Sequence, residues 1–344
     1  MIEGYEMAGY IGRRILLAIF TVWVISMLSF FVIELPEGDL VSKAIDQKMS
    51  GGIDGDVDPK LAEMWRSYFA IDRPIHIRYI EWLKPLLRGD MGMSLWNQNS
   101  DEFAQRRISE VIGERIQLTI ILGVFTILMT WTLAIPVGIY SAVRQHSLGD
   151  YLFTFAGYTG LAVPDFLLGL VLMYFFYAVF DMSVGGLFSA NYVDSQWDFA
   201  RISDMLKHLW IPAIVLGTSG TAGLIRVLRN NLLDELNKPY TVTAIAKGVH
   251  PFKVIMKYPV RVAFNPLIST VGYLLPALIS GSMIVSVVLS LPTLGPILLN
   301  AIEILDTRLA GFIVLIVGVL TVLGTLISDI LLAVVDPRIK LMNK

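Results

Sequence analysis

Four stretches of this 344-residue chain are long enough and apolar enough to cross a lipid bilayer. They are residues 15–33, 116–143, 151–180 and 309–335. The first two carry no charged side chain, the third carries only Asp165 and the fourth only Asp329. Because about 20 consecutive apolar residues in a helix span the hydrocarbon core of a bilayer, each stretch predicts a membrane-spanning helix.

Two more spans are predicted in the second half of the chain. Residues 208–225 are uncharged and rich in small residues, which allow helices to pack closely in membranes. Residues 262–302 are also uncharged and are too long for one span. Pro292 and the pair Gly295-Pro296 interrupt them, so a fifth helix is expected before Pro292 and a partly buried segment after it. The predicted fold is an all-α polytopic membrane protein with six transmembrane helices.

The basic residues of the short connections predict that both termini are cytoplasmic. Residues 226–261 contain seven Lys or Arg side chains, whereas the short loops of the opposite side contain only three. The predicted division of the chain is a cytoplasmic N-terminus 1–11, a first span 12–35, an external loop 36–114, a transmembrane domain 115–335 with helices two to six and a cytoplasmic loop 230–262, and a cytoplasmic C-terminus 336–344.

The first external loop is too long to be a simple turn, and it is expected to form a small folded cap. Asp58-Pro59 supplies an N-cap and a proline at the first helical position, which predicts a helix to about Tyr68. A second, amphipathic helix is predicted because five apolar residues share one face, namely Ile75, Tyr79, Trp82, Leu83 and Leu86. The cap has two interpretations: a surface on which a receptor docks, or a lid that only stabilises the spans.

The composition excludes several classes of function. Hydrophobic residues make up 55% of the chain and charged residues only 16%, fewer than in a soluble domain. Cysteine is absent, which removes disulfides, thiolate metal sites and thiol nucleophiles. The four histidines are scattered, and neither a His-Glu-x-x-His motif nor a glycine-rich phosphate loop occurs. We therefore assign no catalytic, cofactor-binding or metal-binding residue and expect no nucleic-acid partner.

Asp165 and Asp329 are the only carboxylates well inside the predicted spans. Asp165 follows Pro164, where a locally opened helix offers free backbone donors, and Asp329 is near enough to the cytoplasmic end to pair with a basic residue. A structural or gating role is the preferred interpretation of both. The alternatives are a stand-alone proton-coupled secondary transporter that relays protons through these carboxylates, and an intramembrane hydrolase.

A short cytoplasmic helix is predicted between the fourth and fifth spans. Lys238-Pro239 places a proline at the first helical position, and Gly248 supplies a C-cap. Tyr240, Ala244 and Lys247 are expected on one face of this helix, with small residues beside them. Such a helix can be seated in a groove of a partner protein. The alternative is a plain interfacial loop held by lipid phosphates.

The residues of this segment resemble the cytoplasmic signature loop of binding-protein-dependent ABC importer permeases, in the oligopeptide/dipeptide/nickel branch. The similarity continues over nearly the whole chain as an ordered series of motifs. They are Arg13-Arg14, Pro36-Glu37-Gly38-Asp39 with an inserted Glu37, Asp72-Arg73-Pro74, Arg88-Gly89-Asp90-Met91-Gly92-Met93-Ser94, Glu114-Arg115, Ile135-Pro136-Val137-Gly138, Pro164-x-Phe166, Tyr240-x-x-Thr-Ala-x-Ala-Lys-Gly248, Tyr258-Pro-Val-Arg261, Asn265-Pro266 and Asp336-Pro337-Arg338.

The resemblance implies a permease subunit in the cytoplasmic (inner) membrane. Such a subunit pairs with a homologous second permease, two ATPase subunits bind the ATP beneath them, and an external binding protein delivers the substrate. No cofactor is expected in this chain itself. The implied ATPase-coupling residues are Tyr240, Thr243, Ala244, Ala246, Lys247 and Gly248. Ile245 stands where many relatives carry arginine, so an apolar contact is expected there.

The substrate is less sharply implied than the mechanism. The branch takes peptides, nickel complexes and, in some members, oligosaccharides or opine-like compounds. The inserted Glu37 and the acidic excursion at 51–58 resemble a subgroup that handles oligosaccharides as well as peptides. Four tryptophans on the predicted outer side suit stacking on sugars, although interfacial aromatic residues are also common in membrane proteins: Trp65, Trp82, Trp96 and Trp197. Peptides and oligosaccharides therefore both remain as expectations.

Overall fold

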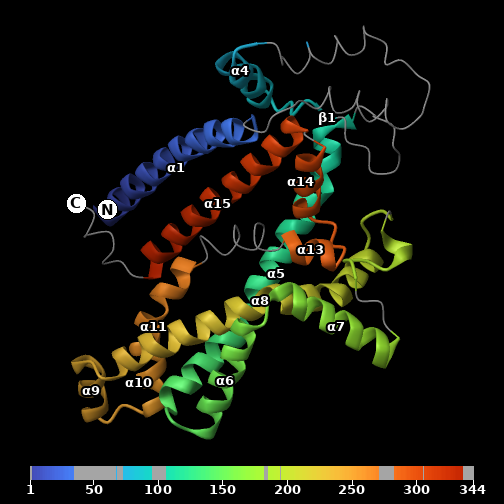
Figure 1. Ribbon diagram of the computed structural model, residues 1–344. Coiled ribbons are helices and arrows are strands. Elements are labelled where there is room, and N and C mark those ends of the chain that lie inside the picture. Colours follow the sequence, from blue (N-terminus) through green and yellow to red (C-terminus); the bar gives the residue numbers. More distant parts are fainter. Residues whose placement is uncertain are drawn as a thin grey trace. The chain divides into compact units, whose positions relative to one another are not determined.

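The structure is a computed structural model that describes residues 2–34, 67, 73–94, 106–181, 185–193, 195–270, 283–304 and 306–335 (Figure 1). Apart from turns and short connections, these residues are helical, with one antiparallel pair of two-residue strands in which Met93 lies opposite Arg107. The elements are α1 Ile2–Glu34, α4 Ile75–Leu86, β1 Met93–Ser94, β2 Arg106–Arg107, α5 Ile108–Val143, α6 Leu148–Ala162, α7 Asp165–Phe180, the 3₁₀ turn η1 Ala190–Tyr192, α8 Phe199–Leu236, α9 Pro239–Ala246, α10 Pro251–Lys257, α11 Pro259–Ala263, α13 Met283–Val288, α14 Leu294–Glu303 and α15 Thr307–Val335.

Four of the described helices, α1, α5, α8 and α15, are long and apolar enough to cross a membrane. The expectation of one helix over 151–180 is wrong, because α6 and α7 are separate helices bent by 103°. The bend lies at Val163, whose extended backbone is the conformation that a following proline favours. The fifth predicted span lies partly in 271–282, outside the described residues, and so does the helix predicted from Asp58 to Tyr68, apart from the single residue 67.

The chain forms two compact units, and α1, α5 and α15 contribute to both. The first unit consists of residues 1–18, 119–292 and 320–344. Its centre is α8, on which α6, α7 and α11 pack. Small residues allow this packing: a Cβ placed on Gly160 of α6 would lie 2.8 Å from a methyl carbon of Thr218. On α8 itself, a Cβ placed on Gly217 would lie 2.9 Å from the Thr130 hydroxyl of α5, so a close helix contact explains this glycine of the predicted span 208–225.

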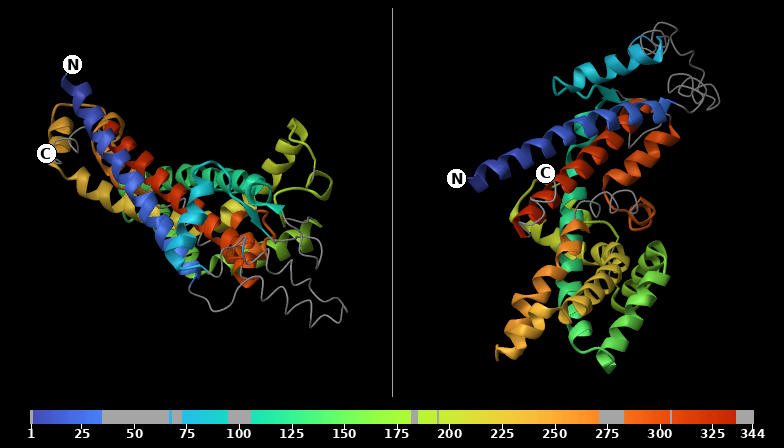
Figure 2. Two further views of the ribbon diagram at one scale, coloured as in Figure 1. Left: turned by 90° about the horizontal axis from the view of Figure 1, so that it is seen from above. Right: turned by 90° about the vertical axis from the view of Figure 1, so that its left-hand side faces the viewer.

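The second unit consists of residues 19–118 and 293–319 and has an aromatic core. The rings of Trp82 and Phe312 stack with their centroids 5.0 Å apart, and Phe30 lies 5.7 Å from Trp82. Within this unit α1 lies beside α15, where Ile25 contacts Gly318 (Figure 2). The predicted inner face of α4 is confirmed at Tyr79, Trp82, Leu83 and Leu86, which join the core, whereas Ile75 is exposed.

Asp306 connects two elements of the second unit and is fully buried. One of its carboxylate oxygens accepts a hydrogen bond from the Leu309 amide at 2.9 Å, which caps the first turn of α15. The other accepts from the Ser94 hydroxyl at 2.6 Å, which holds β1 against that helix end. A carboxylate at a helix N-terminus is stabilised by the free amides and by the helix dipole.

Replacing Asp306 with alanine is expected to destabilise the protein by about 2–4 kcal/mol, because the buried Ser94 hydroxyl and a helix amide both lose their acceptor. The matched control is Asp198→Ala, which removes an exposed N-cap that accepts from the Arg201 amide at 2.7 Å. That variant should cost only about 1 kcal/mol. Thermal unfolding in mild detergent checks both, and equal melting temperatures for the two variants would contradict the role given to Asp306.

Candidate functional site

The segment that follows α8 is built from local signals that the sequence already contains. Pro239 begins α9 directly after Lys238. At the other end Gly248 has a positive φ of 74°, and two hydrogen bonds close the turn: the Gly248 amide to the Ile245 carbonyl at 2.9 Å, and the Val249 amide to the Ala244 carbonyl at 3.3 Å. This pair of bonds is the Schellman arrangement. The prediction of a short helix closed by a glycine C-cap is confirmed.

Gly248→Ala is expected to loosen the end of α9 by about 1 kcal/mol, because a residue with a Cβ is strained at positive φ. A Cβ at this position would meet nothing within 4 Å, so no steric clash adds to that cost. Amide hydrogen exchange of residues 244–249 should accelerate about fivefold. Gly248→Asn is the control, since asparagine tolerates this conformation better, and exchange as fast as in the alanine variant would contradict the explanation.

The N-terminal end of α9 is attached to the last turn of α8. The Tyr240 hydroxyl donates a hydrogen bond to the Glu235 carboxylate, and the Thr241 hydroxyl donates to the Glu235 carbonyl at 3.0 Å. Two causes raise the pKa of Tyr240 to about 12: partial burial is the larger one, and the hydrogen bond to the anionic Glu235 carboxylate is the second. Its phenol therefore stays protonated at neutral pH and remains a donor. The joint between the two helices is held by side chains as well as by the backbone.

The exposed surface of α9 differs in one residue from the expected one. Thr243, Ala246 and Lys247 are exposed, and Tyr240 is 39% exposed, but Ala244 is buried at 7% exposure. Ala244, which was expected on the same face as Tyr240 and Lys247 and among the coupling residues, is therefore not part of the exposed surface of α9. The helix α9 packs against α8 and α10, and Ala244 is one of its two buried residues, with Thr241.

Two apolar side chains project outward from α9, and only one of them was expected. Ile245 is 59% exposed and Val242 is 55% exposed. Ile245 had been singled out as an apolar contact, whereas Val242 was missed. The exposed apolar residues Val242 and Ile245 alternate here with the exposed polar residues Thr243 and Lys247. Val242 and Ile245 are three residues apart and therefore lie on the same side of the helix. The helical period could have indicated this exposed side if the buried position of Ala244 had been known.

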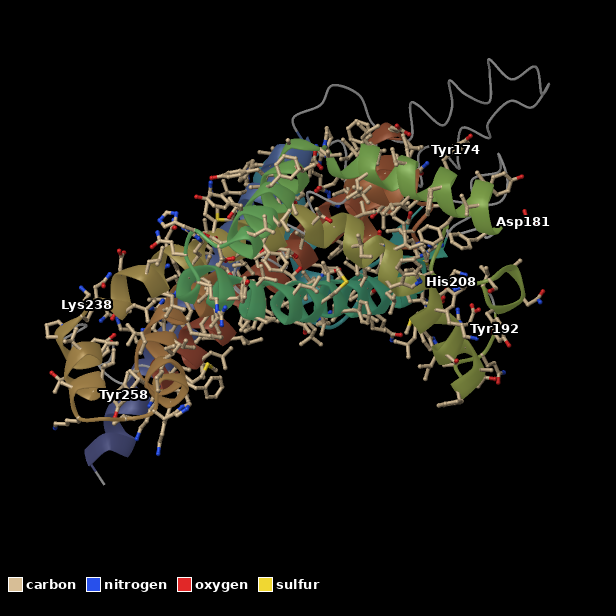
Figure 3. All side chains as sticks on the ribbon, turned by 90° about the horizontal axis from the view of Figure 1, so that it is seen from below. Tyr174, Asp181, Tyr192, His208, Lys238 and Tyr258 are labelled. Carbon is tan, nitrogen blue, oxygen red and sulfur yellow. The ribbon has the colours of Figure 1, made fainter. Side chains whose placement is uncertain are left out.

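A set of exposed cations surrounds α9. Its members are Lys238, Lys247, Lys253, Lys257 and Arg261. Figure 3 shows Lys238 and Tyr258 at one end of the first unit, far from Tyr192 and His208 at the other. Because α8 is continuous from Phe199 to Leu236, it connects the two ends through one hydrogen-bonded rod of 38 residues.

Arg201 organises the loop at the other end of α8. Its guanidinium lies 4.6 Å from the ring centroids of both Phe188 and Trp197 and donates to two backbone carbonyls of the loop. One turn further along, Asp204 accepts from the amide and the hydroxyl of Ser189 at 2.7 and 2.6 Å. The two charged residues fold this loop onto α8. Trp197 thus contacts Arg201, and its side chain is 41% exposed.

The two carboxylates singled out within the spans have separate partners. Asp329 forms an ion pair with Arg14 at 2.7 Å, which confirms the expected basic neighbour. Asp165, the first residue of α7, accepts from the Ser219 hydroxyl of α8 at 3.5 Å, rather than taking the free backbone donors that were expected to contact it. Within the described residues, no group of three or more His, Cys, Asp or Glu side chains is placed to hold a metal ion.

A buried ion pair between α6 and α8 was missed by the sequence analysis. Arg229 donates to both oxygens of Asp150, from Nε at 3.0 Å and from Nη2 at 2.9 Å. Asp150 also accepts from the backbone amide of His146 at 3.0 Å, and its own amide donates to the Ser147 hydroxyl at 3.2 Å. The spacing Ser147-x-x-Asp150 is a helix-start signal, but nothing in it indicates a partner 79 residues later.

Comparison with known proteins shows which family the sequence of this chain matches and which proteins it is similar to. A family described as "Binding-protein-dependent transport system inner membrane component" matches residues 134–341. The chain is 34% identical to the oligopeptide transport system permease protein AppB of Bacillus subtilis over 335 residues, covering 97% of this chain and all of that protein. It is 29% identical to the inner membrane ABC transporter permease protein YejB of Escherichia coli O157:H7, over 97% of this chain and 99% of that one. It is 27% identical to the dipeptide transport system permease protein DppB of Escherichia coli K12, with the same coverage.

Proposed function

Because the chain belongs to the family of binding-protein-dependent transport system inner membrane components and is a permease subunit of an ABC importer, we propose that α9 is the element through which ATPase subunits drive it. This membership replaces the alternative of a stand-alone proton-coupled secondary transporter. The carrying observation is the geometry of α9. Its exposed Val242 and Ile245 offer an apolar contact, and Glu235 joins the helix to the end of α8.

The proposed cycle uses α8 as the connection between the two ends of the subunit. ATP binding closes the ATPase dimer and moves the grooves in which the coupling helices of the two permeases lie. The movement of α9 is passed to α8 at Glu235, and from α8 to α6 through Arg229 and Asp150. The ATPase subunits act on one end of α8 and the external binding protein on the other. Each of these partners can therefore shift the equilibrium of the subunit between its inward- and outward-facing states. The coupling contacts come from Tyr240, Val242, Thr243, Ile245, Ala246, Lys247 and the turn at Gly248, with Ala244 as the inner support.

The proposed orientation places α9 and both termini in the cytoplasm and the loop at Arg201 outside. It rests on the exposed cations around α9, since basic residues are enriched on the cytoplasmic side. With α6 and α7 counted as one bent span, and with the predicted fifth span, part of which lies outside the described residues, the chain crosses the inner membrane six times. It encloses the pathway together with a homologous second permease, above two ATPase subunits and below an external binding protein.

Peptides are the proposed substrate class. The names of two similar proteins, the oligopeptide and dipeptide permeases, support this choice. The aromatic side chains considered for sugar stacking offer less support for oligosaccharides, because Trp82 is 5% exposed in the core of the second unit and Trp197 contacts Arg201. Trp65 and Trp96 lie outside the described residues.

The test is affinity purification of this chain in mild detergent, expressed with its neighbouring genes, followed by mass spectrometry and reconstitution. A second permease and ATPase subunits in near-equal amounts, and ATP-dependent uptake of short peptides delivered by the co-purified binding protein, are expected. Uptake by the chain alone, without an ATPase, would contradict the proposed coupling. Uptake of oligosaccharides but not of peptides would contradict the substrate class alone.

A further inference from the structure

Two adjoining cavities lie on the first unit, along α8. The first, of about 130 Å³, is formed by α6 and α8, and the second, of about 200 Å³, by α5, α6 and α8. They share four lining residues, Phe153, Gly157, Ala222 and Ile225. The cavities therefore form one continuous groove, and its occupant must match both parts.

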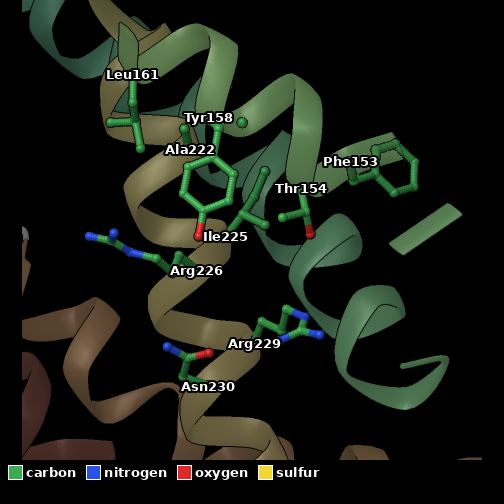
Figure 4. A pocket seen from close by; sticks show the side chains of 10 residues that line it. Phe153, Thr154, Tyr158, Leu161, Ala222, Ile225, Arg226, Arg229 and Asn230 are labelled. Atoms are coloured by element: carbon green, nitrogen blue, oxygen red, sulfur yellow. The ribbon is translucent and has the colours of Figure 1, made fainter. Parts of the chain in front are cut away.

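The first cavity has a polar end. Arg226, Arg229 and Asn230 line it from α8, and Thr154 and Tyr158 from α6. Figure 4 shows the Tyr158 hydroxyl directed toward the part of the cavity where these three α8 residues lie, whereas Leu161 lies at the opposite end. Arg229 is already neutralised by Asp150, but the structure gives the exposed Arg226 no ion-pair partner among the described residues. The Arg226 guanidinium is therefore available to bind an anion at this end of the groove.

The second cavity is lined mainly by apolar side chains. Met129, Leu133 and Val137 line it from α5, and Gly160 and Gly217 form part of its walls. An apolar cavity of about 150 Å³ is large enough to bind benzene. The second cavity therefore has room for a segment of hydrocarbon chain.

The length of the apolar part matches one leaflet of a bilayer. Its lining on α8 begins at Ile214 and ends at Ile225, and Arg226 follows directly. At 1.5 Å per residue these eleven steps cover about 16 Å. Half of the hydrocarbon core of a bilayer is about 15 Å. An amphiphile whose chain fills the second cavity thus has its polar group at the level of Arg226.

We propose that this groove binds one anionic phospholipid, with an acyl chain along α5, α6 and α8 and the phosphate at Arg226 and Asn230. The lipid comes from the leaflet on the side of α9, which on the orientation proposed above is the cytoplasmic leaflet, where anionic lipids attract basic residues. Its phosphate supplies the negative charge that Arg226 lacks. Its chain covers apolar surface that α6 leaves open.

The test is native mass spectrometry of the assembled importer released from nanodiscs that contain phosphatidylglycerol or phosphatidylcholine. The wild type should retain phosphatidylglycerol in preference, and Arg226→Gln should weaken this retention at least about fivefold. The matched control is Arg144→Gln, which removes an exposed guanidinium that lines neither cavity. Equal retention in the two variants would overturn the proposal.

A second pair of variants tests the acyl chain. Leu133→Trp fills the apolar cavity and should lower retention, whereas Leu128→Trp, on the same helix but outside the lining, should not. If inorganic phosphate displaces the lipid completely and Leu133→Trp has no effect on retention, the groove is a simple anion site. That result would overturn the proposal.

Photolabelling of the wild-type complex needs no variant. Phosphatidylglycerol with a photoreactive group in its acyl chain should label 153–161 and 214–225. If these residues carry no lipid label and are cross-linked to the second permease instead, a protein covers the groove. That result would overturn the proposal.

Discussion

Ile245→Asp in α9 is expected to abolish ATP-driven uptake while the chain remains folded in the membrane. The side chain is 59% exposed, so the change does not disturb the interior of the subunit. In the proposed complex, however, the carboxylate would be desolvated in an apolar contact without a partner. Central interface residues typically contribute 2 kcal/mol or more. The affinity for the ATPase subunits should therefore fall about 30-fold or further.

Ile245→Val is the matched control, since it keeps the apolar character and removes a single methylene group. Co-purification of the ATPase subunits and ATP-dependent uptake in proteoliposomes measure the effect for both variants. A substitution at Ala244 would be a weaker test than one at Ile245, because Ala244 is buried and its replacement would disturb the packing of α9 itself. Normal uptake by the Ile245→Asp variant would contradict the docking role of the exposed face of α9.

Asp150→Ala is expected to destabilise the first unit by about 2–4 kcal/mol, because Asp150 is buried and the change removes two charge-assisted hydrogen bonds from the partly exposed Arg229. Asp150 is 2% exposed, and Arg229 holds it with two hydrogen bonds. The loss also frees the backbone amide of His146, a residue with a positive φ of 63°. Because the pair joins α6 to α8, the proposed transmission from α9 should weaken as well, so ATP hydrolysis becomes less well coupled to uptake.

A double-mutant cycle separates the pair from its surroundings. Arg229→Met and the double variant complete the cycle, and the coupling free energy should be about 1–3 kcal/mol in favour of the pair. Arg144→Met, in the turn between α5 and α6 and exposed, is the control and should change the unfolding free energy by less than about 0.5 kcal/mol. Thermal unfolding in detergent and the ratio of ATP hydrolysed to substrate taken up are the measurements. Additive effects of the two single variants would contradict the coupling.

Properties that depend on a few neighbouring residues could be predicted from the sequence. The apolar parts of α1, α5 and α15 follow from the apolar runs at 15–33, 116–143 and 309–335, since each helix satisfies its own backbone hydrogen bonds in lipid. The N-terminal extensions of α1 and α5, which contain charged residues, did not follow from them. The bounds of α9 follow from Pro239 and Gly248, because helix starts and C-caps are local. Pro164 likewise indicated an interruption of the helix at 151–180. The size of the bend between α6 and α7, 103°, could not be predicted from the presence of a proline.

Properties that depend on packing were decided only by the tertiary structure. Ala244 faces inward because α8 and α10 lie against it, a contact that the repeat of α9 does not contain. Trp82 is buried because Phe30 and Phe312, far away in the sequence, meet its ring. Arg229 finds Asp150 across 79 residues for the same reason. The sequence by itself determined four membrane-capable helices, the family and the bounds of α9 through local patterns. Which faces are open and which charges are paired was decided by the tertiary packing, because those contacts join segments whose separation along the chain carries no information about their distance in space.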